Sequence, residues 1–315
     1  MPPLIFCKSC TKEVFPSYLI YPKPKIYDIL RYYNTGVMPS CRVLNFSMKK
    51  ALCLILIICL MFSLCACGNS QGYGVRTVAT LVKQEYALAF RTGDITIFYV
   101  SAAIQVLNAQ GKIDELNRKW FGTSLVTFPR DAEALNKIGM PETRNFVVGI
   151  DLDSFPFAYK DTNGAYWGFD IELATAVCEL LDWNLSFQQI EHENTYVELS
   201  SGNIDCAWGG IAIDQKMVDE GMYEPLGPYV ENDIIIASRA GSGISSKLQL
   251  RGKRMAMNIN DESLAALDTV PRIKNSLGQI IRLTGGSVEC FQYLYDNKCD
   301  LVLTDSTAAI YYKNR

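Results

Sequence analysis

Hydrophobic and polar positions from residue 146 onward alternate between two kinds of segment. Short apolar runs at 146–150, 234–237 and 301–303 predict buried strands. Residues 169–181 instead place their apolar side chains on one face of a helix. Further strands are expected at 185–187, 204–208 and 255–257, and further helices at 193–201, 262–268 and 287–297. This alternation predicts an α/β fold with largely parallel sheets, in which ligands bind where the strands end.

A second hydrophobic pattern precedes this region. Lys49 and Lys50 are followed by an uncharged apolar run, 51–64, which is too short to span a bilayer comfortably as a permanent anchor. It ends in Leu-Cys-Ala-Cys at 64–67, which resembles the lipobox of bacterial lipoproteins. Residues 48–67 are therefore expected to be a lipoprotein signal peptide, with Cys67 receiving the lipid that holds the protein at the membrane. An uncleaved transmembrane anchor is the alternative.

Residues 1–47 do not fit this interpretation. They are rich in Pro, Tyr and Cys and show neither helical nor alternating periodicity. Because a secretory signal starts close to the initiator, Met48 suits that role. We expect 1–47 to be an upstream extension foreign to the secreted protein, with a genuine disordered extension as the alternative.

Composition narrows the function classes. The 315 residues are 49% hydrophobic and 20% charged, with a net charge of −3, and no stretch concentrates Lys and Arg, so a nucleic-acid partner is not expected. The single histidine, His192, argues against His-rich metal sites and hydrolytic triads. Neither a metal nor a cofactor is predicted.

Seven of the eleven cysteines precede residue 68. Cys7 and Cys10 have metal-ligand spacing, but no second Cys or His pair lies nearby to complete a zinc site. Of the others, Cys178 and Cys206 are expected in the core. A disulfide between Cys290 and Cys299 stays open.

Several motifs then occur in a fixed order: Val-Gly-Ile-Asp at 148–151, Phe-Pro-Phe at 155–157, Gly-Phe-Asp-Ile-Glu-Leu-Ala at 168–174, and the segments 199–205, 250–254 and 300–312. In this order and spacing, the chain from Arg144 onward resembles the family 3 bacterial extracellular solute-binding proteins, receptors for polar amino acids. The resemblance implies a two-lobed, type II periplasmic-binding-protein-like fold.

The order of the chain departs from that family. Residues 85–94 and 111–122 resemble the family's carboxyl-terminal strand, helix and closing tryptophan motif, yet here they come first. We therefore predict a circularly permuted domain in which 123–143 is the linker, since domain termini often lie close together. Lobe 1 would cover 94–237, and lobe 2 would combine 72–93 with 238–315. Fusion of two truncated genes is the alternative.

The resemblance also implies ligand-binding positions. Asp305 stands where the family binds an ammonium group, although it could instead cap the helix that follows it. His192 stands where a stacking aromatic is usual, but it could be a solvated loop residue. Ser154 occupies the other aromatic position, and Phe155 next to it could form a displaced wall or pack in the core.

Other positions depart from the family pattern. The loop from Gly209 and Gly210 carries Ala212 and Met217 at the places of the hydroxyl donor and the carboxylate-binding arginine, and a thioether cannot replace a guanidinium. In lobe 2, Asp261 and Glu262 add negative charge where hydroxyl residues are usual. The site is thus expected to favour a cationic or amine-bearing ligand without a free carboxylate. A degenerate receptor is the alternative.

The resulting functional prediction is an extracytoplasmic, lipid-anchored receptor that delivers a polar amino acid or related small amine to an ABC permease. A solute-sensing lipoprotein without a transport role is an alternative. An enzyme on the same fold is a further one, since some relatives are dehydratases or lytic transglycosylases. Glu262 or Asp261 would then be the general acid or base. We expect no catalytic activity.

Overall fold

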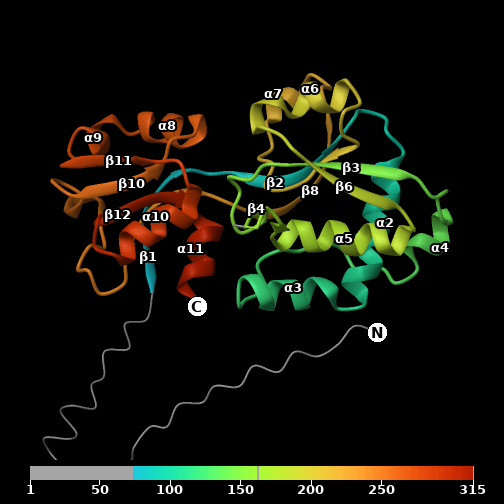
Figure 1. The fold of residues 1–315 in the computed structure, drawn as a ribbon, viewed down its shortest axis with the longest axis horizontal. Coiled ribbons are helices and arrows are strands. Elements are labelled where there is room, and N and C mark those ends of the chain that lie inside the picture. Colours follow the sequence, from blue (N-terminus) through green and yellow to red (C-terminus); the bar gives the residue numbers. More distant parts are fainter. Residues whose placement is uncertain (1–73, 162, 315) are drawn as a thin grey trace, which may run out of the picture. The chain divides into compact units, whose positions relative to one another are not determined.

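The strands form two separate five-stranded sheets, each with helices on both faces (Figure 1). The computed structural model describes residues 74–161 and 163–314, so the segments 1–47 and 48–67 and the predicted lipidation site Cys67 lie outside the described residues. Sheet A has the order β1-β9-β12-β10-β11, and sheet B has the order β6-β3-β7-β2-β8. We call each sheet with its covering helices a lobe.

The strands of sheet A, in sheet order, are β1 (Val75–Val82), β9 (Ile234–Arg239), β12 (Leu301–Asp305), β10 (Arg254–Asn258) and β11 (Gln279–Leu283). The helices of this lobe are α8 (Asp261–Asp268), α9 (Pro271–Lys274), α10 (Gly286–Tyr295) and α11 (Ser306–Lys313), with a short 3-10 helix at Lys247–Gln249.

The strands of sheet B, in sheet order, are β6 (Asn184–Gln189), β3 (Asn145–Ile150), β7 (Cys206–Ala207), β2 (Glu85–Phe90) and β8 (Glu224–Glu231). The helices of this lobe are α2 (Thr96–Ala109), α3 (Lys112–Trp120), α4 (Ala134–Ile138), α5 (Phe169–Leu181), α6 (Thr195–Ser200) and α7 (Gln215–Asp219), with a 3-10 helix at His192–Asn194. A small hairpin joins β4 (Tyr159–Lys160) to β5 (Tyr166–Trp167).

The α/β class and the predicted elements are confirmed, because every strand and helix expected from the periodicity is present within a few residues. Helix α5 has the predicted bounds. Alternation along the strands explains why sheet A is apolar on both faces. In β9, Ile235 and Ala237 pack towards α10 and α11, whereas Ile234 and Ile236 pack towards α8 and α9.

The prediction of largely parallel sheets was only half right. Strand β10 is parallel to β11 and β12, and β3 is parallel to β6 and β7, but β1 and β9 in sheet A and β2 and β8 in sheet B run antiparallel to their neighbours. These antiparallel strands are the ones that continue from one sheet into the other, β1 into β2 and β8 into β9. The backbone N–H of Asn232 donates to the carbonyl of Gln84 over 2.9 Å and joins the two crossovers.

The observed lobe boundaries therefore differ from the predicted ones. The prediction gave 94–237 to lobe 1 and combined 72–93 with 238–315 in lobe 2. Strand β2 belongs to sheet B and β9 to sheet A. The crossovers therefore lie between Val82 and Glu85 and between Glu231 and Ile234. The apolar runs of β2 and β9 continue closely from the strand before, so hydrophobicity alone did not mark where the chain changes sheet.

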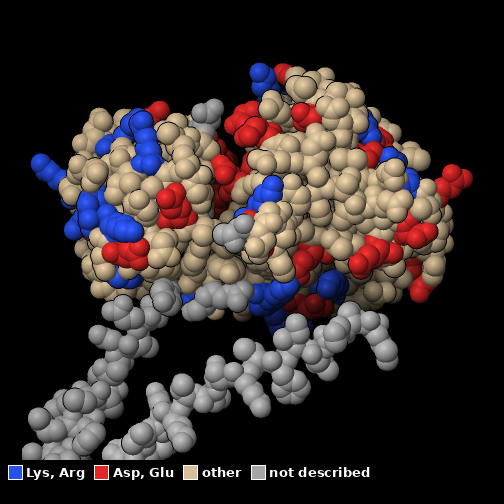
Figure 2. All heavy atoms as spheres, in the orientation of Figure 1, with Lys and Arg blue, Asp and Glu red and all other residues tan. Residues whose placement is uncertain are grey.

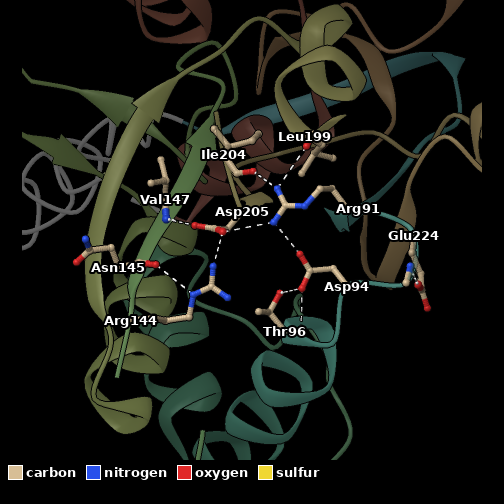
Figure 3. A network of polar contacts seen from close by, with 11 residues as sticks. Arg91, Asp94, Thr96, Arg144, Asn145, Val147, Leu199, Ile204, Asp205 and Glu224 are labelled. Carbon is tan, nitrogen blue, oxygen red and sulfur yellow. Dashed lines mark hydrogen bonds and ion pairs between the residues drawn. The ribbon is translucent and has the colours of Figure 1, made fainter. Parts of the chain in front are cut away.

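A partly buried polar network fixes the segment that follows β2 in the sheet B lobe (Figure 3). The guanidinium of Arg91 donates to the carbonyl of Ile204 over 2.6 Å and to the Asp94 carboxylate over 2.7 Å. Asp205 accepts from Arg144 over 2.6 Å and from the backbone N–H of Val147 over 2.8 Å. These hydrogen bonds thus join residues that are far apart in the sequence at one end of sheet B.

The segment 123–143 packs on the same lobe. The buried side chain of Asn117 donates to the carbonyl of Val126 over 2.8 Å and accepts from the backbone N–H of that residue over 2.9 Å. Asn108, also buried, donates to the carbonyl of Phe128 over 2.6 Å. Hydrogen bonds from these two side chains hold the backbone of the predicted linker against helices α2 and α3.

The described cysteines Cys178, Cys206, Cys290 and Cys299 are all buried and free. Cys178 and Cys206 lie in the core as predicted, and Cys290 and Cys299 do not form the disulfide that was left open. Across 74–161 and 163–314, no helix has the length and apolar character needed to cross a membrane.

Candidate functional site

The carboxyl ends of parallel strands from both sheets meet at a small cavity of about 30 Å³. Strand β3 ends at Ile150 and leads to Asp151, Asp153 and Ser154, which line the cavity. Strand β10 ends at Asn258, and β12 ends at Asp305, which line it from the other lobe. This is the edge at which open α/β sheets place their ligands.

A glycine turn after β7 forms part of the sheet B wall. Gly210 has a φ of +75°, and a Cβ atom there would lie 2.3 Å from Cβ of Ser154, so no side chain fits. The N–H of Gly210 donates to the carboxylate of Asp170 over 3.2 Å, and the hydroxyl of Tyr229 donates to the same oxygen over 2.6 Å. Asp170, which is 1% exposed, thus holds this turn from behind the cavity.

Asp305 is oriented by the crossover between β8 and β9. The amide of Asn232, fully buried, donates to Asp305 Oδ1 over 2.9 Å, and its Oδ1 accepts from the Thr307 hydroxyl over 2.6 Å. The Asp305 side chain makes no capping bond to α11, so the capping role considered for it is not observed. Its carboxylate is oriented by a neutral amide and not by a cation.

Glu262 is held in the same manner by the other crossover, since the side-chain amide of Gln84 donates to Glu262 Oε1. Both crossovers between the lobes therefore supply an amide that fixes a cavity carboxylate. No ion pair is recorded for Asp151, Asp153, Glu262 or Asp305 within the described ranges.

The electrostatics of the cavity follow from this lack of cations. Burial, with the neighbouring charges of Asp153, Glu191 and Glu262, raises the pKa of Asp151 to about 7 against the lowering effect of the Asp153 N–H. Burial also raises the pKa of Glu262 and Asp305 well above that of an ordinary carboxyl, and the negative charges around each add to the rise. A buried carboxylate without a cation is costly, so this site is poised to accept a positive charge.

His192 lines the cavity from the 3-10 helix after β6. Burial lowers the pKa of His192, against the raising effect of Glu193 and Asp214, which keeps the imidazole neutral near pH 7. Here His192 also borders a second, outer cavity of about 220 Å³. Glu191 and Glu193, on either side of it, line only the outer cavity.

Five of the predicted ligand-binding residues line the inner cavity: Asp305, His192, Ser154, Gly210 and Glu262. The predicted positions Phe155, Gly209, Ala212 and Met217 do not line it.

Phe155 packs in the core of the sheet A lobe, with its ring centroid 4.9 Å from that of Tyr311. Ala212 pairs with Tyr86 in an isolated bridge, and Met217 lies on α7 against a small apolar cluster. Gly209 is buried beneath Ile150, where its Cβ position lies 3.3 Å from that residue, and Asp261 is the first residue of α8. Met217 therefore provides no cation to the cavity.

The lining also includes residues that the sequence did not single out. The chief ones are Tyr86, Asp151, Asp153, Asn258, Asn260 and Ser287. Asp151 and Asp153 could have been found, because two carboxylates directly after the buried strand 146–150 lie where ligands bind. Tyr86 could not, because β2 comes from the segment placed out of order.

Acidic side chains gather at the groove between the lobes, chiefly on the side of the sheet B lobe, on the face seen in Figure 2. Among the described residues, no Lys or Arg lines the inner cavity. Within the described residues, no group of His, Cys, Asp and Glu has an arrangement able to hold a metal ion.

Comparisons with known proteins show what part of the chain is similar to. Residues 146–281 match the family of bacterial extracellular solute-binding proteins, family 3. The chain is similar to the probable amino-acid-binding protein YxeM of Bacillus subtilis, at 29% identity over 35% of this chain and 40% of that one. It is also similar to the arginine-binding extracellular protein ArtP of Bacillus subtilis, at 28% identity over 37% and 44%. The chain thus spans less than half the length of these curated relatives.

Among solved structures, the chain is similar to a substrate-binding protein of an ABC uptake transporter from Streptococcus pneumoniae with bound histidine. The identity is 25%, the coverage is 53% of this chain and 68% of that one, and the TM-score is 0.41. An ancestral cationic amino acid solute-binding protein is 24% identical over 57% and 75%, with a TM-score of 0.42. The predicted α/β class is confirmed by the two sheets and their covering helices. Through residues 146–281, somewhat less than half of its length, the chain is similar to the bacterial extracellular solute-binding proteins, family 3.

Proposed function

We propose that this protein is an extracytoplasmic receptor that captures a small cationic or amine-bearing solute and delivers it to an ABC permease. The observation that carries the proposal is the inner cavity, which Asp151, Asp153, Glu262 and Asp305 line without any Lys or Arg. An ammonium group can form charge-assisted hydrogen bonds with these carboxylates. Without such a ligand, the carboxylates would be buried with no cationic partner, which is costly.

An α-amino acid with a free carboxylate fits this cavity poorly. Such a carboxylate would need a guanidinium fork or several converging donors. Met217 occupies the predicted place of the arginine and lies on α7 outside the lining, and the neighbouring Lys216 is exposed to solvent. The solute is therefore a cation that lacks a carboxylate group.

Transport by such a receptor requires the lobes to close around the solute and reopen. The two short crossovers supply a hinge, and each contributes an amide, Gln84 or Asn232, to a cavity carboxylate. A cation bound at Glu262 and Asp305 would thus act, through the amides of Gln84 and Asn232, on the two crossovers about which the lobes move. We propose no catalytic role for Asp261 or Glu262, in keeping with a family of receptors.

We further propose that the receptor is exported by the signal 48–67 and anchored through lipid on Cys67. The support is the sequence 64–67 alone. Metabolic labelling with a radioactive fatty acid tests this, because the native chain should incorporate label and Cys67→Ser should not. Equal labelling of both forms contradicts the proposal.

We propose as well that the order of the domain is circularly permuted and that 123–143 joins the ancestral ends. Strand β2, from the early segment, lies between β7 and β8 in sheet B. The two ends of the described chain border one groove, lined by Gly74–Thr77 and by Ile310 and Lys313. A chain reordered to begin at Arg144, with Asn314 linked to Gly74, should melt cooperatively like the original. A reordered chain that does not fold contradicts the proposal.

The receptor function is tested by thermal melts of the purified full-length chain in mild detergent, with α-amino acids, small primary amines and quaternary amines. Selective binding to the native state raises the melting temperature. We expect amines without a carboxylate to raise it and their α-amino-acid counterparts to leave it unchanged. A shift with ordinary α-amino acids contradicts the proposed solute class, and a melt that no solute shifts contradicts the receptor function.

A further inference from the structure

Two adjoining cavities of different size lie along the cleft. The inner one, of about 30 Å³, and the outer one, of about 220 Å³, share Asp151, Asp153, His192, Asn260 and Glu262. Asp305 lines only the inner cavity, whereas Glu191 and Glu193 line only the outer one. The shared residues make the two cavities one continuous acidic path from the interior towards solvent.

The size of the inner cavity limits what it can hold. A cavity needs roughly 10–15 Å³ of such volume to hold one water molecule, so this one has room for about two. An ammonium group with its first methylene is of that size, and a whole amino acid is not. The inner cavity is therefore a pocket for one end of a molecule.

Open acceptors face this inner pocket. Asn258 is 8% exposed and lines the cavity, and its Oδ1 accepts no hydrogen bond from any described residue, while its Nδ2 is used by Asp153. Asp305 has one oxygen bonded to Asn232, and its Oδ2 has no partner in 74–161 or 163–314. An amide oxygen and a carboxylate oxygen that both lack donors among the described residues can accept hydrogen bonds from an ammonium group, which only donates.

The outer cavity offers a second, separate anionic position. Glu191 and Glu193 are exposed, and no ion pair or hydrogen bond of their side chains is recorded in the described chain. Ile259, 47% exposed, adds an apolar surface to this cavity. A single small amine seated at Asp305 would leave the Glu191–Glu193 pair without a cation.

We propose that the cleft binds a linear organic dication, an α,ω-diamine or short polyamine, with one ammonium at Asp305 and Asn258 and the other at Glu191 and Glu193. This inference rests on the proposed receptor function and specifies its solute. The hydrocarbon chain between the ammonium groups passes Ile259, and the shared carboxylates of Asp151, Asp153 and Glu262 line the path between the two ends.

The test compares matched probes by isothermal titration with the full-length chain in mild detergent. Putrescine carries two ammonium groups, N-acetylputrescine has a similar backbone with one, and butylamine is the simple monoamine. We expect putrescine or the longer cadaverine to bind about tenfold more tightly than N-acetylputrescine, with the advantage reduced at high salt because the outer position is exposed to solvent.

Variants separate the two ends. The double change Glu191→Gln and Glu193→Gln should remove the advantage of the diamine and leave monoamine affinity in place, whereas Asp305→Asn should weaken both. The double change Glu142→Gln and Glu179→Gln removes the same charge from exposed positions outside both cavities and should keep the advantage.

The outcomes distinguish this inference from the function on which it rests. If the diamine and the acetylated diamine bind equally, or if the Glu191 and Glu193 changes leave the ratio intact, the second ammonium position is wrong while the receptor function stands. If no amine binds, the proposed function fails together with the inference.

Discussion

The side-chain amide of Asn258 donates to Asp153 Oδ2 over 2.8 Å, and this bond joins the sheet A lobe to the sheet B lobe. Asn258 ends β10, and Asp153 follows β3, so the bond lies where the two sheets face each other across the cavity. The lobes are thus connected beside the inner cavity by a hydrogen bond within the protein itself.

Replacing Asn258 by Ala should shift the protein towards an open arrangement of its lobes. The change removes the interlobe hydrogen bond and leaves the Asp153 carboxylate facing three other carboxylates, which favours separation. The expected loss of stability is about 1 kcal/mol. Small-angle scattering should report a larger radius of gyration for the variant without ligand.

The matched control is Asn184→Ala, because the amide of Asn184 bonds Asn145 over 3.2 Å within a single sheet. This variant should keep the radius of gyration of the native protein. An unchanged radius for Asn258→Ala would show that the bond does not hold the lobes together.

Replacing Gly210 by Ala should damage the cavity wall. The new Cβ would meet Ser154 at 2.3 Å, and a φ of +75° is strained for any residue with a side chain. We expect a loss of about 2–4 kcal/mol in unfolding free energy and loss of the ligand-induced shift in melting temperature.

Gly221→Ala separates these two causes, because Gly221 has a φ of +70° and nothing within 4 Å of its Cβ position. It should cost about 1 kcal/mol by strain alone and preserve ligand binding. Equal losses for the two variants in urea titrations would mean that the contact with Ser154 does not matter.

Replacing Arg91 by Met should unfold the protein at lower urea concentration. The carbonyl of Ile204 and the Asp205 carboxylate would lose a charged donor while staying partly shielded from solvent, at a cost of about 2 kcal/mol. Arg118→Met on α3 changes an exposed arginine and should have little effect. A similar midpoint for both variants would show that the network in Figure 3 contributes nothing to stability.

Periodicity predicted most elements because a strand that is covered on both faces requires apolar residues throughout. Segments such as 146–150 and 255–257 therefore stand out from their surroundings. The direction and sheet of each strand follow from tertiary pairing, which leaves no local signal. For this reason β2 and β9 were placed in the wrong lobe and the antiparallel halves of the sheets were missed.

The site was predicted in part for a similar reason. Asp305, Glu262 and His192 follow predicted strands, so a resemblance of motifs could place them. Tyr86 and Asn258 reach the cavity through strand order and through contact between the lobes. Phe155, next to the well-placed Ser154, faces the core instead, because a one-residue shift in a turn reverses the direction of a side chain.

Stability without ligand should fall as the pH rises towards neutrality. Burial raises the pKa of Asp151 to about 7 and also raises the pKa of Glu262 and Asp305, whereas unfolded carboxyls titrate near about 4. Between about pH 4 and about pH 7 the folded state therefore binds more protons than the unfolded state. The stabilisation is therefore complete below about pH 4 and is lost as the pH rises through about 7.

Thermal melts measure this directly, and the melting temperature should be several degrees higher near pH 5 than near pH 8. Burial also raises the pKa of Asp170 to about 7, so the double change Asp305→Asn and Glu262→Gln should reduce the slope without abolishing it. A slope that the double change leaves intact would assign the effect to Asp151, to Asp170 and to groups outside the cavity, and not to Asp305 and Glu262.

A cationic ligand should show the opposite dependence on pH. Its ammonium group requires ionised carboxylates, and the fraction of Asp151, Glu262 and Asp305 that is ionised increases as the pH rises through their raised pKa values. Calorimetric affinity for an amine should therefore increase from about pH 5 to about pH 8, the range in which the free protein becomes less stable. Because Asp305 and Glu262 contribute to both trends, the double change Asp305→Asn and Glu262→Gln should weaken both without abolishing either, since Asp151 and Asp170 remain. An affinity independent of pH would mean that the bound amine does not rely on these carboxylates.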